Sequence, residues 1–212
     1  MSDSWLLAEP AEAPIAQILL AHGAGSPMDS DWMNQVTAML VESGVRVVRF
    51  EFDYMHRRRE DGTKRPPSKQ DKLLIEFQEQ LEAARQAFPG LPWFVGGKSM
   101  GGRVATHLAC ADADLCGVLC WGYPFHPAGK PDTLRIEHLP QLKSPCCMLQ
   151  GTRDALGSQE DVAGYDLPES LGFVWFDDGD HDLKPRKASG FTQEQHLAAS
   201  TVCAAAFMQA FG

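Results

Sequence analysis

The sequence predicts an α/β protein built on a mostly parallel sheet of about seven strands with helices on both faces. Short runs of Val, Ile, Leu and aromatic residues alternate with longer segments whose apolar residues recur at helical spacing, which is the pattern of repeated β–α–β units. Most of the short runs are apolar throughout, as expected of strands covered on both faces. The 212 residues are enough for one substantial core, so we expect a single domain over residues 1–212.

The strands are predicted where these apolar runs are bounded by glycine, proline or polar residues. In chain order they are Trp5–Ala8, Ile15–Ala21, Val45–Phe50, Trp93–Gly97, Gly117–Trp121, Cys146–Gln150 and Phe173–Phe176. Because helical segments join most of them, we expect these strands to run parallel.

Three helices between or after the strands have recognisable limits. The first follows Ser30, a candidate cap, and ends before Gly44; its apolar face carries Met33, Val36 and Leu40. The second follows Ser68 and stops at Pro89-Gly90, with an apolar face made by Leu73, Phe77, Leu81 and Ala84. The last opens with the capping-box pattern T-Q-E-Q at residues 192–195 and continues to the C-terminus through Leu197, Ala204, Met208 and Phe211.

Long connections are predicted at residues 22–29, 51–67 and 122–144. Each follows a strand, so each lies at the carboxyl edge of the sheet. Ligands bind at this edge in open α/β sheets, so these connections are the expected walls of a site.

Composition and charge exclude several classes of function. The formal net charge of −9 argues against nucleic acid as a partner, because binding phosphates requires a surplus of Lys and Arg. The N-terminus lacks a basic segment followed by a long apolar one, and no run reaches the roughly 20 apolar residues that span a bilayer. We therefore expect a cytoplasmic protein with no membrane partner. The six cysteines show no C-x-x-C spacing and are expected to be buried, reduced thiols.

The pattern G-x-S-x-G occurs at Gly97-Lys98-Ser99-Met100-Gly101, between an apolar strand and a helical segment. The pattern alone is weak, but this strand-to-helix context favours a sharp turn that exposes Ser99 as a nucleophile. The helix that begins there directs its N–H groups toward a developing oxyanion, and Met100 N–H is the first candidate donor. The alternative is a glycine-rich turn that only packs tightly or holds a phosphate.

A second oxyanion donor is expected from the glycine-rich segment His22-Gly23-Ala24-Gly25, which follows an earlier strand. We assign this role to Ala24 N–H and expect His22 to bond within its own loop. Judged alone, the segment also fits a plain turn.

A serine nucleophile needs a base, and that base needs an acceptor to hold one tautomer. Of seven histidines, His181 follows the last strand on a loop short enough to reach Ser99, whereas His56, His107 and His196 lie in a charged loop or in helices. Asp154 follows the preceding strand and lies between Ser99 and His181 in chain order, as the arrangement Ser…Asp…His requires.

The acidic run D-D-G-D-H-D around His181 also suits a divalent metal. Its spacing matches no calcium loop and equally fits a solvated acidic turn, so we predict no metal and no cofactor.

Together the H-G-A-G loop, the G-K-S-M-G turn, D-A-L-G and D-G-D-H resemble the α/β-hydrolase superfamily over nearly the whole chain. The stretches G-G-K-S-M-G-G-R and F-D-Y-M…R-P-P look like its small dienelactone-hydrolase-like branch, which includes a testis-expressed protein and a subunit of a chromatin acetyltransferase complex. The resemblance implies the α/β-hydrolase fold, Ser99, Asp154 and His181 as nucleophile, acid and base, and Ala24 and Met100 as oxyanion donors. Dienelactone hydrolases proper carry cysteine in place of Ser99, so their substrate is not carried over.

The resemblance implies a serine hydrolase, and an open cleft would suit small soluble esters or related acyl substrates. Lid domains of this fold enter where residues 122–144 lie, a stretch too short for a helical cap, so we expect no lid and an open cleft with Tyr123 and Phe125 at its rim. Arg57, Arg58 or Arg59 in the basic stretch 57–65 either contacts an anionic substrate or belongs to a solvated charge run. A non-catalytic interaction module and a thioesterase, acyltransferase or peptidase remain alternatives, and the oligomeric state is left open.

Overall fold

The computed structural model describes residues 5–212 and contains a seven-stranded sheet in the order β1-β3-β2-β4-β5-β6-β7. All neighbouring strands are parallel except β1, which pairs antiparallel with β3 at one edge. The strands are β1 (Trp5–Ala8), β2 (Ala16–Ala21), β3 (Val45–Phe50), β4 (Trp93–Lys98), β5 (Gly117–Trp121), β6 (Cys146–Gly151) and β7 (Leu171–Phe176). The predicted fold class is confirmed, and each predicted strand agrees with an observed one to within two residues.

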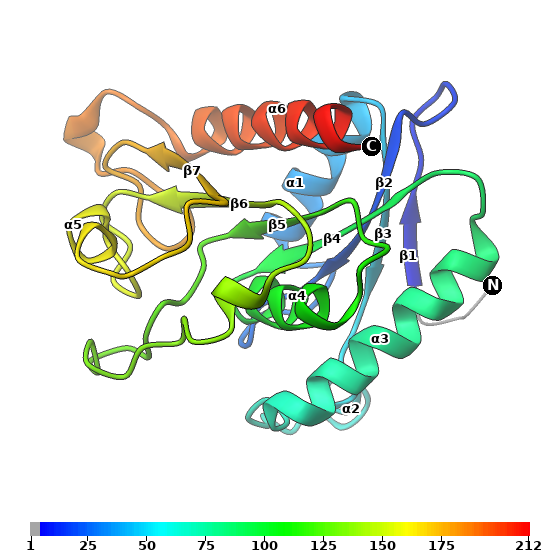
Figure 1. Cartoon of the computed structure of the whole chain (residues 1–212), viewed down its shortest axis with the longest axis horizontal. Helices are drawn as coiled ribbons and strands as arrows, with labels where there is room; N and C mark the ends of the chain where they lie inside the picture. The colour runs from blue at the N-terminus through cyan, green and yellow to red at the C-terminus, as the bar shows by residue number, and fades with distance from the viewer. Residues whose placement is uncertain (1–4) are drawn as a thin grey trace.

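Helices cover both faces of the sheet, with α1 (Asp31–Glu42) and α6 (Gln193–Phe211) on one side and α3 (Gln70–Ala87) and α4 (Met100–Ala111) on the other (Figure 1). Each face buries its own apolar core. Four of the five inner strands, β2, β4, β5 and β6, are buried at every residue, which explains why their sequences are mostly apolar rather than alternating.

The predicted helix limits follow local chemistry. The last helix begins with the predicted capping box, in which the Thr192 side chain accepts from Gln195 N–H and the Gln195 side chain accepts from Thr192 N–H. Gly44, at φ +85°, follows α1 in a left-handed conformation that a residue with a side chain rarely adopts. The second predicted helix begins at Gln70, just beyond Ser68.

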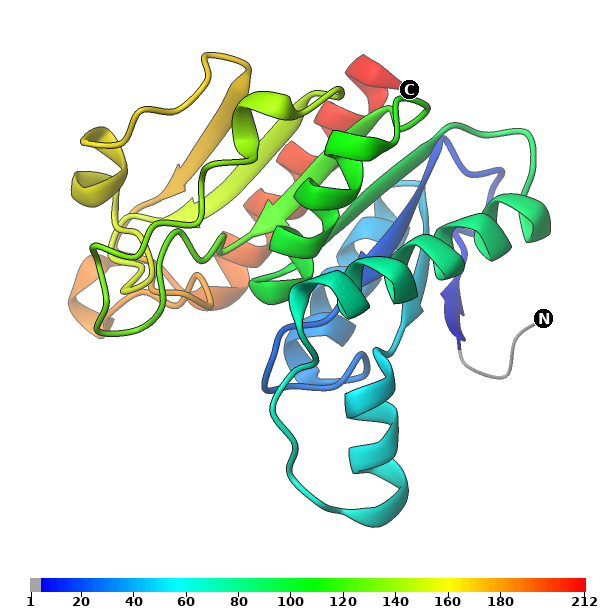
Figure 2. The same cartoon turned by 60° about the horizontal axis from the view of Figure 1, so that its bottom comes forward.

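The connection 51–67 is not loop throughout, because it contains α2 (Asp53–Asp61), which projects beyond the sheet (Figure 2). The prediction missed this helix because it buries only Tyr54 and Met55 and so has no apolar periodicity. Two features of the sequence could have indicated the helix. Asp53 and Arg57 have helical spacing and form an ion pair (3.1 Å), and Gly62 ends the helix in a left-handed conformation.

Three short helical segments complete the described chain: η1 (Leu139–Gln141), α5 (Gln159–Ala163) and η2 (Lys187–Ser189). The described residues include no lid domain over the carboxyl edge of the sheet, and no described helix is long and apolar enough to cross a membrane.

Candidate active site

Ser99 lies on a sharp turn between the end of β4 and the start of α4. Its backbone has φ 53° and ψ −113°, a strained conformation for a residue with a side chain. Ser99 N–H donates to Trp121 O of β5 over 2.9 Å, which fixes the turn against the neighbouring strand. The predicted strand–turn–helix context of Ser99 is therefore present.

The glycines around Ser99 are required by close backbone contacts. A Cβ on Gly97 would lie 2.6 Å from Ala21 O, and one on Gly101 would lie 2.5 Å from the same atom. The end of β2 thus presses directly on both sides of the turn, and any side chain at either position would force the backbone apart.

The structure brings the predicted serine, histidine and aspartate side chains together. His181, on the loop after β7, places Nε2 2.8 Å from Ser99 Oγ. Its Nδ1 lies 2.8 Å from Asp154 Oδ2, on the loop after β6. Both distances are those of good hydrogen bonds, so the arrangement can move a proton from the hydroxyl to the imidazole.

Asp154 is fully buried, and both of its carboxylate oxygens accept hydrogen bonds. Its Oδ1 accepts from Leu156 N–H, and its Oδ2 accepts from Gln150 Nε2, each over 2.8 Å. Oδ2 also faces His181 Nδ1, so that nitrogen carries the proton and Nε2 is free to accept from Ser99. Gln150 was not predicted as part of the site, although a glutamine ending an otherwise apolar strand was a usable signal.

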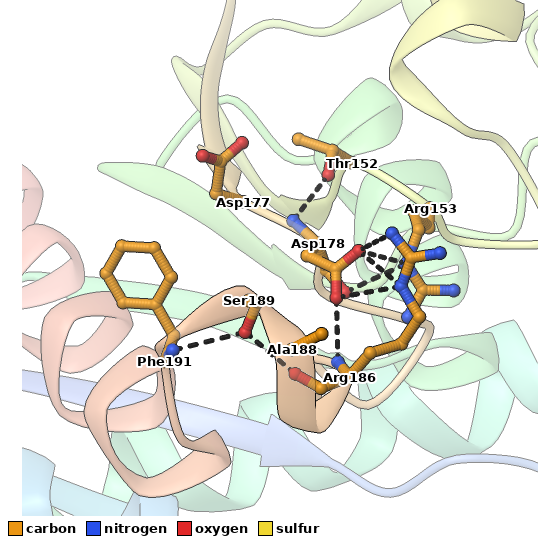
Figure 3. A pocket seen from close by; sticks show the side chains of 8 residues that line it. All are labelled: Thr152, Arg153, Asp177, Asp178, Arg186, Ala188, Ser189 and Phe191. Atoms are coloured by element: carbon orange, nitrogen blue, oxygen red, sulfur yellow. Dashed lines mark hydrogen bonds and ion pairs between the residues drawn. The ribbon is translucent and has the colours of Figure 1, made fainter.

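A second cluster ties the loop of Asp154 to the loop of His181 beside a cavity of about 400 Å³ (Figure 3). Asp178 N–H donates to Thr152 Oγ1 over 2.8 Å, and the Asp178 carboxylate pairs with Arg153 and Arg186. Bonds from Arg186 hold the pKa of Asp178 at about 2. This cluster fixes the relative position of the two loops.

The acidic run around His181 is engaged within the protein. Besides Asp178, Asp180 Oδ1 accepts from the main-chain N–H groups of Asp182 and Lys184, and Asp182 pairs with Lys98 (3.1 Å). Among the described residues, no group of three His, Cys, Asp or Glu side chains is placed to hold a metal. These contacts hold the loop that carries His181 in place.

The glycine-rich loop after β2 lies beside Ser99, and His22 anchors it. His22 Nδ1 lies 2.7 Å from Gly23 O and its Nε2 accepts from Phe52 N–H over 3.2 Å, so Nδ1 carries the proton. Burial lowers the pKa of His22, which keeps the ring neutral. His22 bonds within its own loop, as predicted, and also to the segment that follows β3.

Ala24 faces a cavity of about 370 Å³ that also exposes Ser99 and His181. Tyr54, which the sequence did not indicate, places its hydroxyl 3.0 Å from Ala24 O and 3.9 Å from Met100 Sδ. This hydroxyl contacts both residues predicted to supply oxyanion donors. The remaining residues that line the cavity are Gly23, Gly25, Ser26, Ser30, Asp31, Trp32, Met33, Lys98 and Asp182.

Tyr123 and Phe125 do not lie at the rim of this cavity, so that expectation was wrong. Both side chains are fully buried; the Tyr123 hydroxyl donates to Arg135 O over 2.7 Å, and the two rings pack 4.8 Å apart. The left-handed turn at Gly122 (φ +64°) follows β5, and the apolar rings after it gain more by burial than by lining an open cleft.

Arg57 and Arg58 lie on α2 rather than in a loop, and neither lines the cavity. Arg57 pairs with Asp53, while Arg59 pairs with Asp29 and Glu51. Arg58 donates to Gly25 O over 3.2 Å and is the basic side chain of the three that reaches the glycine-rich loop.

Residues 14–209 match the model of a known family, described as an alpha/beta hydrolase domain. The chain belongs to this alpha/beta hydrolase family. The match spans every strand from β2 onward and includes Ser99, Asp154 and His181.

Solved structures share the fold of this alpha/beta hydrolase at low sequence identity. A dienelactone hydrolase from Anabaena variabilis is 20% identical with a TM-score of 0.74, covering 98% of this chain and 91% of its own. Est1E from Butyrivibrio proteoclasticus, with ferulic acid bound, is 15% identical with a TM-score of 0.69 and coverages of 98% and 94%. An alpha-beta serine hydrolase homologue from Coxiella burnetii is 14% identical with a TM-score of 0.69 and coverages of 97% and 89%.

Proposed function

We propose that this alpha/beta hydrolase is a serine esterase in which Ser99, His181 and Asp154 act as nucleophile, base and acid. The observation that carries the proposal is the unbroken chain of contacts from Ser99 Oγ through His181 to a buried, hydrogen-bonded Asp154, each link 2.8 Å long. A non-catalytic interaction module has no need for this alignment at a strained turn that faces a cavity.

In the proposed reaction, Ser99 Oγ forms a bond to the ester carbonyl carbon while its proton passes to His181 Nε2. The oxyanion is stabilised by the main-chain N–H groups of Ala24 and Met100. When the carbon–oxygen bond to the alcohol breaks, the alcohol takes the proton from Nε2. Water then repeats the sequence on the acyl-enzyme, its proton passes through His181 to Ser99 Oγ, and the acid is released.

The cavity supports small soluble acyl substrates. Its volume of about 370 Å³ is at the small end for a ligand site, and Trp32 and Met33 provide its larger apolar side chains. We therefore expect short-chain esters to be hydrolysed faster than emulsified long-chain triglyceride. The motif G-G-K-S-M-G-G-R and the dienelactone hydrolase neighbour support placement in a dienelactone-hydrolase-like branch.

Replacing the nucleophile tests the function directly. Ser99→Ala should abolish hydrolysis of p-nitrophenyl acetate and labelling by a fluorophosphonate probe, because no other hydroxyl contacts His181 Nε2 among the residues described. Ser26→Ala, which removes a hydroxyl lining the same cavity without bonding to His181, is the matched control and should still be labelled. A folded parent protein that the probe does not label would favour the interaction module instead, and full activity in Ser99→Ala would exclude Ser99 as the nucleophile.

A further inference from the structure

Lys98 is a buried lysine at the last position of β4, directly before Ser99. Its side chain is only 9% exposed, although a lysine is rarely buried without a partner. Its Nζ donates to the main-chain oxygen of His181 over 2.5 Å and lies 3.1 Å from Asp182 Oδ1. The ammonium group therefore contacts the base-bearing loop at two adjacent residues.

The aliphatic part of Lys98 lies against the glycine-rich loop on the other side of Ser99. A Cβ built on Gly23 would lie 3.6 Å from Lys98 Cγ and 3.8 Å from Ser99 Cβ. One side chain thus extends from the loop that carries Ala24 to the loop that carries His181, and it lines the cavity between them.

The cation is balanced by the groups around it. Burial lowers the pKa of Lys98, and the charge of Asp182 opposes this effect. Nζ also lies 5.6 Å from the centre of the Trp32 ring, and Trp32 Nε1 donates to Asp182 O over 3.3 Å. α1 and β4 therefore hold the same loop through Trp32 and Lys98.

We propose that Lys98 is a positioning residue that fixes the backbone at His181, so that Nε2 stays within reach of Ser99 Oγ. The loop needs such a contact because it contains Leu183 in a left-handed conformation (φ 60°), a strained state that the surrounding contacts must maintain. Displacing a catalytic group by about 1 Å costs on the order of 100-fold in rate, so a single contact at the His181 carbonyl has a measurable effect. The inference rests on the proposed esterase function.

The test replaces Lys98 by methionine, which keeps the aliphatic stem and removes the donor. We expect Lys98→Met to lower kcat on p-nitrophenyl acetate by roughly 10- to 100-fold while KM changes by less than about 3-fold, because the substrate-binding surface is retained. Amide hydrogen exchange in residues 177–186 should become faster in the same variant.

Lys143→Met is the matched control, because Lys143 Nζ also donates to a main-chain oxygen, that of Ala111, over 2.9 Å, and Lys143 does not line the cavity. It should leave kcat and exchange in residues 177–186 unchanged. If Lys98→Met does not fold, Lys98→Gln, which keeps a shorter polar side chain, is measured in the same way.

Unchanged kcat, or a lower kcat with unchanged exchange in residues 177–186, would overturn the proposal, because the contact would not act through that loop. A parent that the fluorophosphonate probe does not label contradicts the proposed function instead. In that case amide hydrogen exchange still tests the contact between Lys98 and the loop. Unchanged exchange of residues 177–186 in Lys98→Met would overturn the contact, and faster exchange would support it.

Discussion

At the scale of single residues, the site depends on side chains whose orientation is fixed by hydrogen bonds. The Asp154 carboxylate is held by one main-chain N–H, one glutamine amide and the imidazole. Buried carboxylates stay ionised when hydrogen bonds replace the lost water. A carboxylate at this position would stabilise the imidazolium of the proposed reaction.

Asp154→Asn should lower kcat by about 10³- to 10⁴-fold, the scale known from other serine triads. An asparagine amide that faces His181 Nδ1 favours the tautomer with a proton on Nε2, which cannot accept from Ser99. The measurement is steady-state hydrolysis of p-nitrophenyl acetate. Asp132→Asn, at an exposed position in the 122–144 connection, is the control. A rate within 10-fold of the parent's would exclude Asp154 as the orienting acid.

At the scale of elements, the turn at Ser99 depends on how closely α4 approaches β2. Gly101, in the first turn of α4, meets the main-chain oxygens of both Ala21 and His22 at distances too short for a side chain. This approach brings the N-terminus of α4 beside the start of the glycine-rich loop, the two segments that carry Met100 and Ala24.

Gly101→Ala should destabilise the fold by about 1 to 3 kcal/mol, because the new Cβ must displace backbone rather than a flexible side chain. Gly25→Ala is the matched control, since a Cβ at Gly25 meets nothing within 4 Å. Denaturant unfolding of both variants measures the difference. Equal stability of the two would mean that the close approach to β2 has no energetic consequence.

At the scale of the whole molecule, the 122–144 connection packs against α4 through a pair of histidines. His107 of α4 and His138 stack with ring centres 3.5 Å apart, and His138 Nε2 lies 2.8 Å from Thr106 Oγ1. Burial lowers the pKa of His107 to about 4 and that of His138 to about 3, so both rings are neutral near neutral pH.

These two pKa values predict an acid-sensitive contact between α4 and the connection. Both folded-state pKa values lie below the unfolded value of 6.5, so the stability that the neutral rings contribute is fully present above pH 6.5. It falls as the pH drops toward 4, because the histidines then bind protons in the unfolded chain but not in the folded protein. His107→Phe keeps the stacking and removes one titrating ring. Between pH 6.5 and 4.5 it should lose about 1 kcal/mol less unfolding free energy than the parent, after allowance for solvent screening of partly exposed rings.

Denaturant unfolding at several pH values measures this difference. His56→Phe, which removes an exposed imidazole on α2, should retain the parent's dependence. The same pH dependence in His107→Phe and in the parent would contradict the assignment.

The sequence by itself determined the strands, the main helices that cover the sheet and the candidate site residues that local chemistry specifies. Apolar runs, caps and the G-K-S-M-G turn are local signals, and the rule that parallel strands end at one edge is enough to bring residues 99, 154 and 181 together. The direction of the Tyr123 and Phe125 rings, the helical state of residues 53–61 and the contacts of Tyr54 and Lys98 were decided only in the tertiary structure. Each of these depends on which distant backbone atom or apolar surface packs against the residue. A single sequence does not specify such long-range contacts.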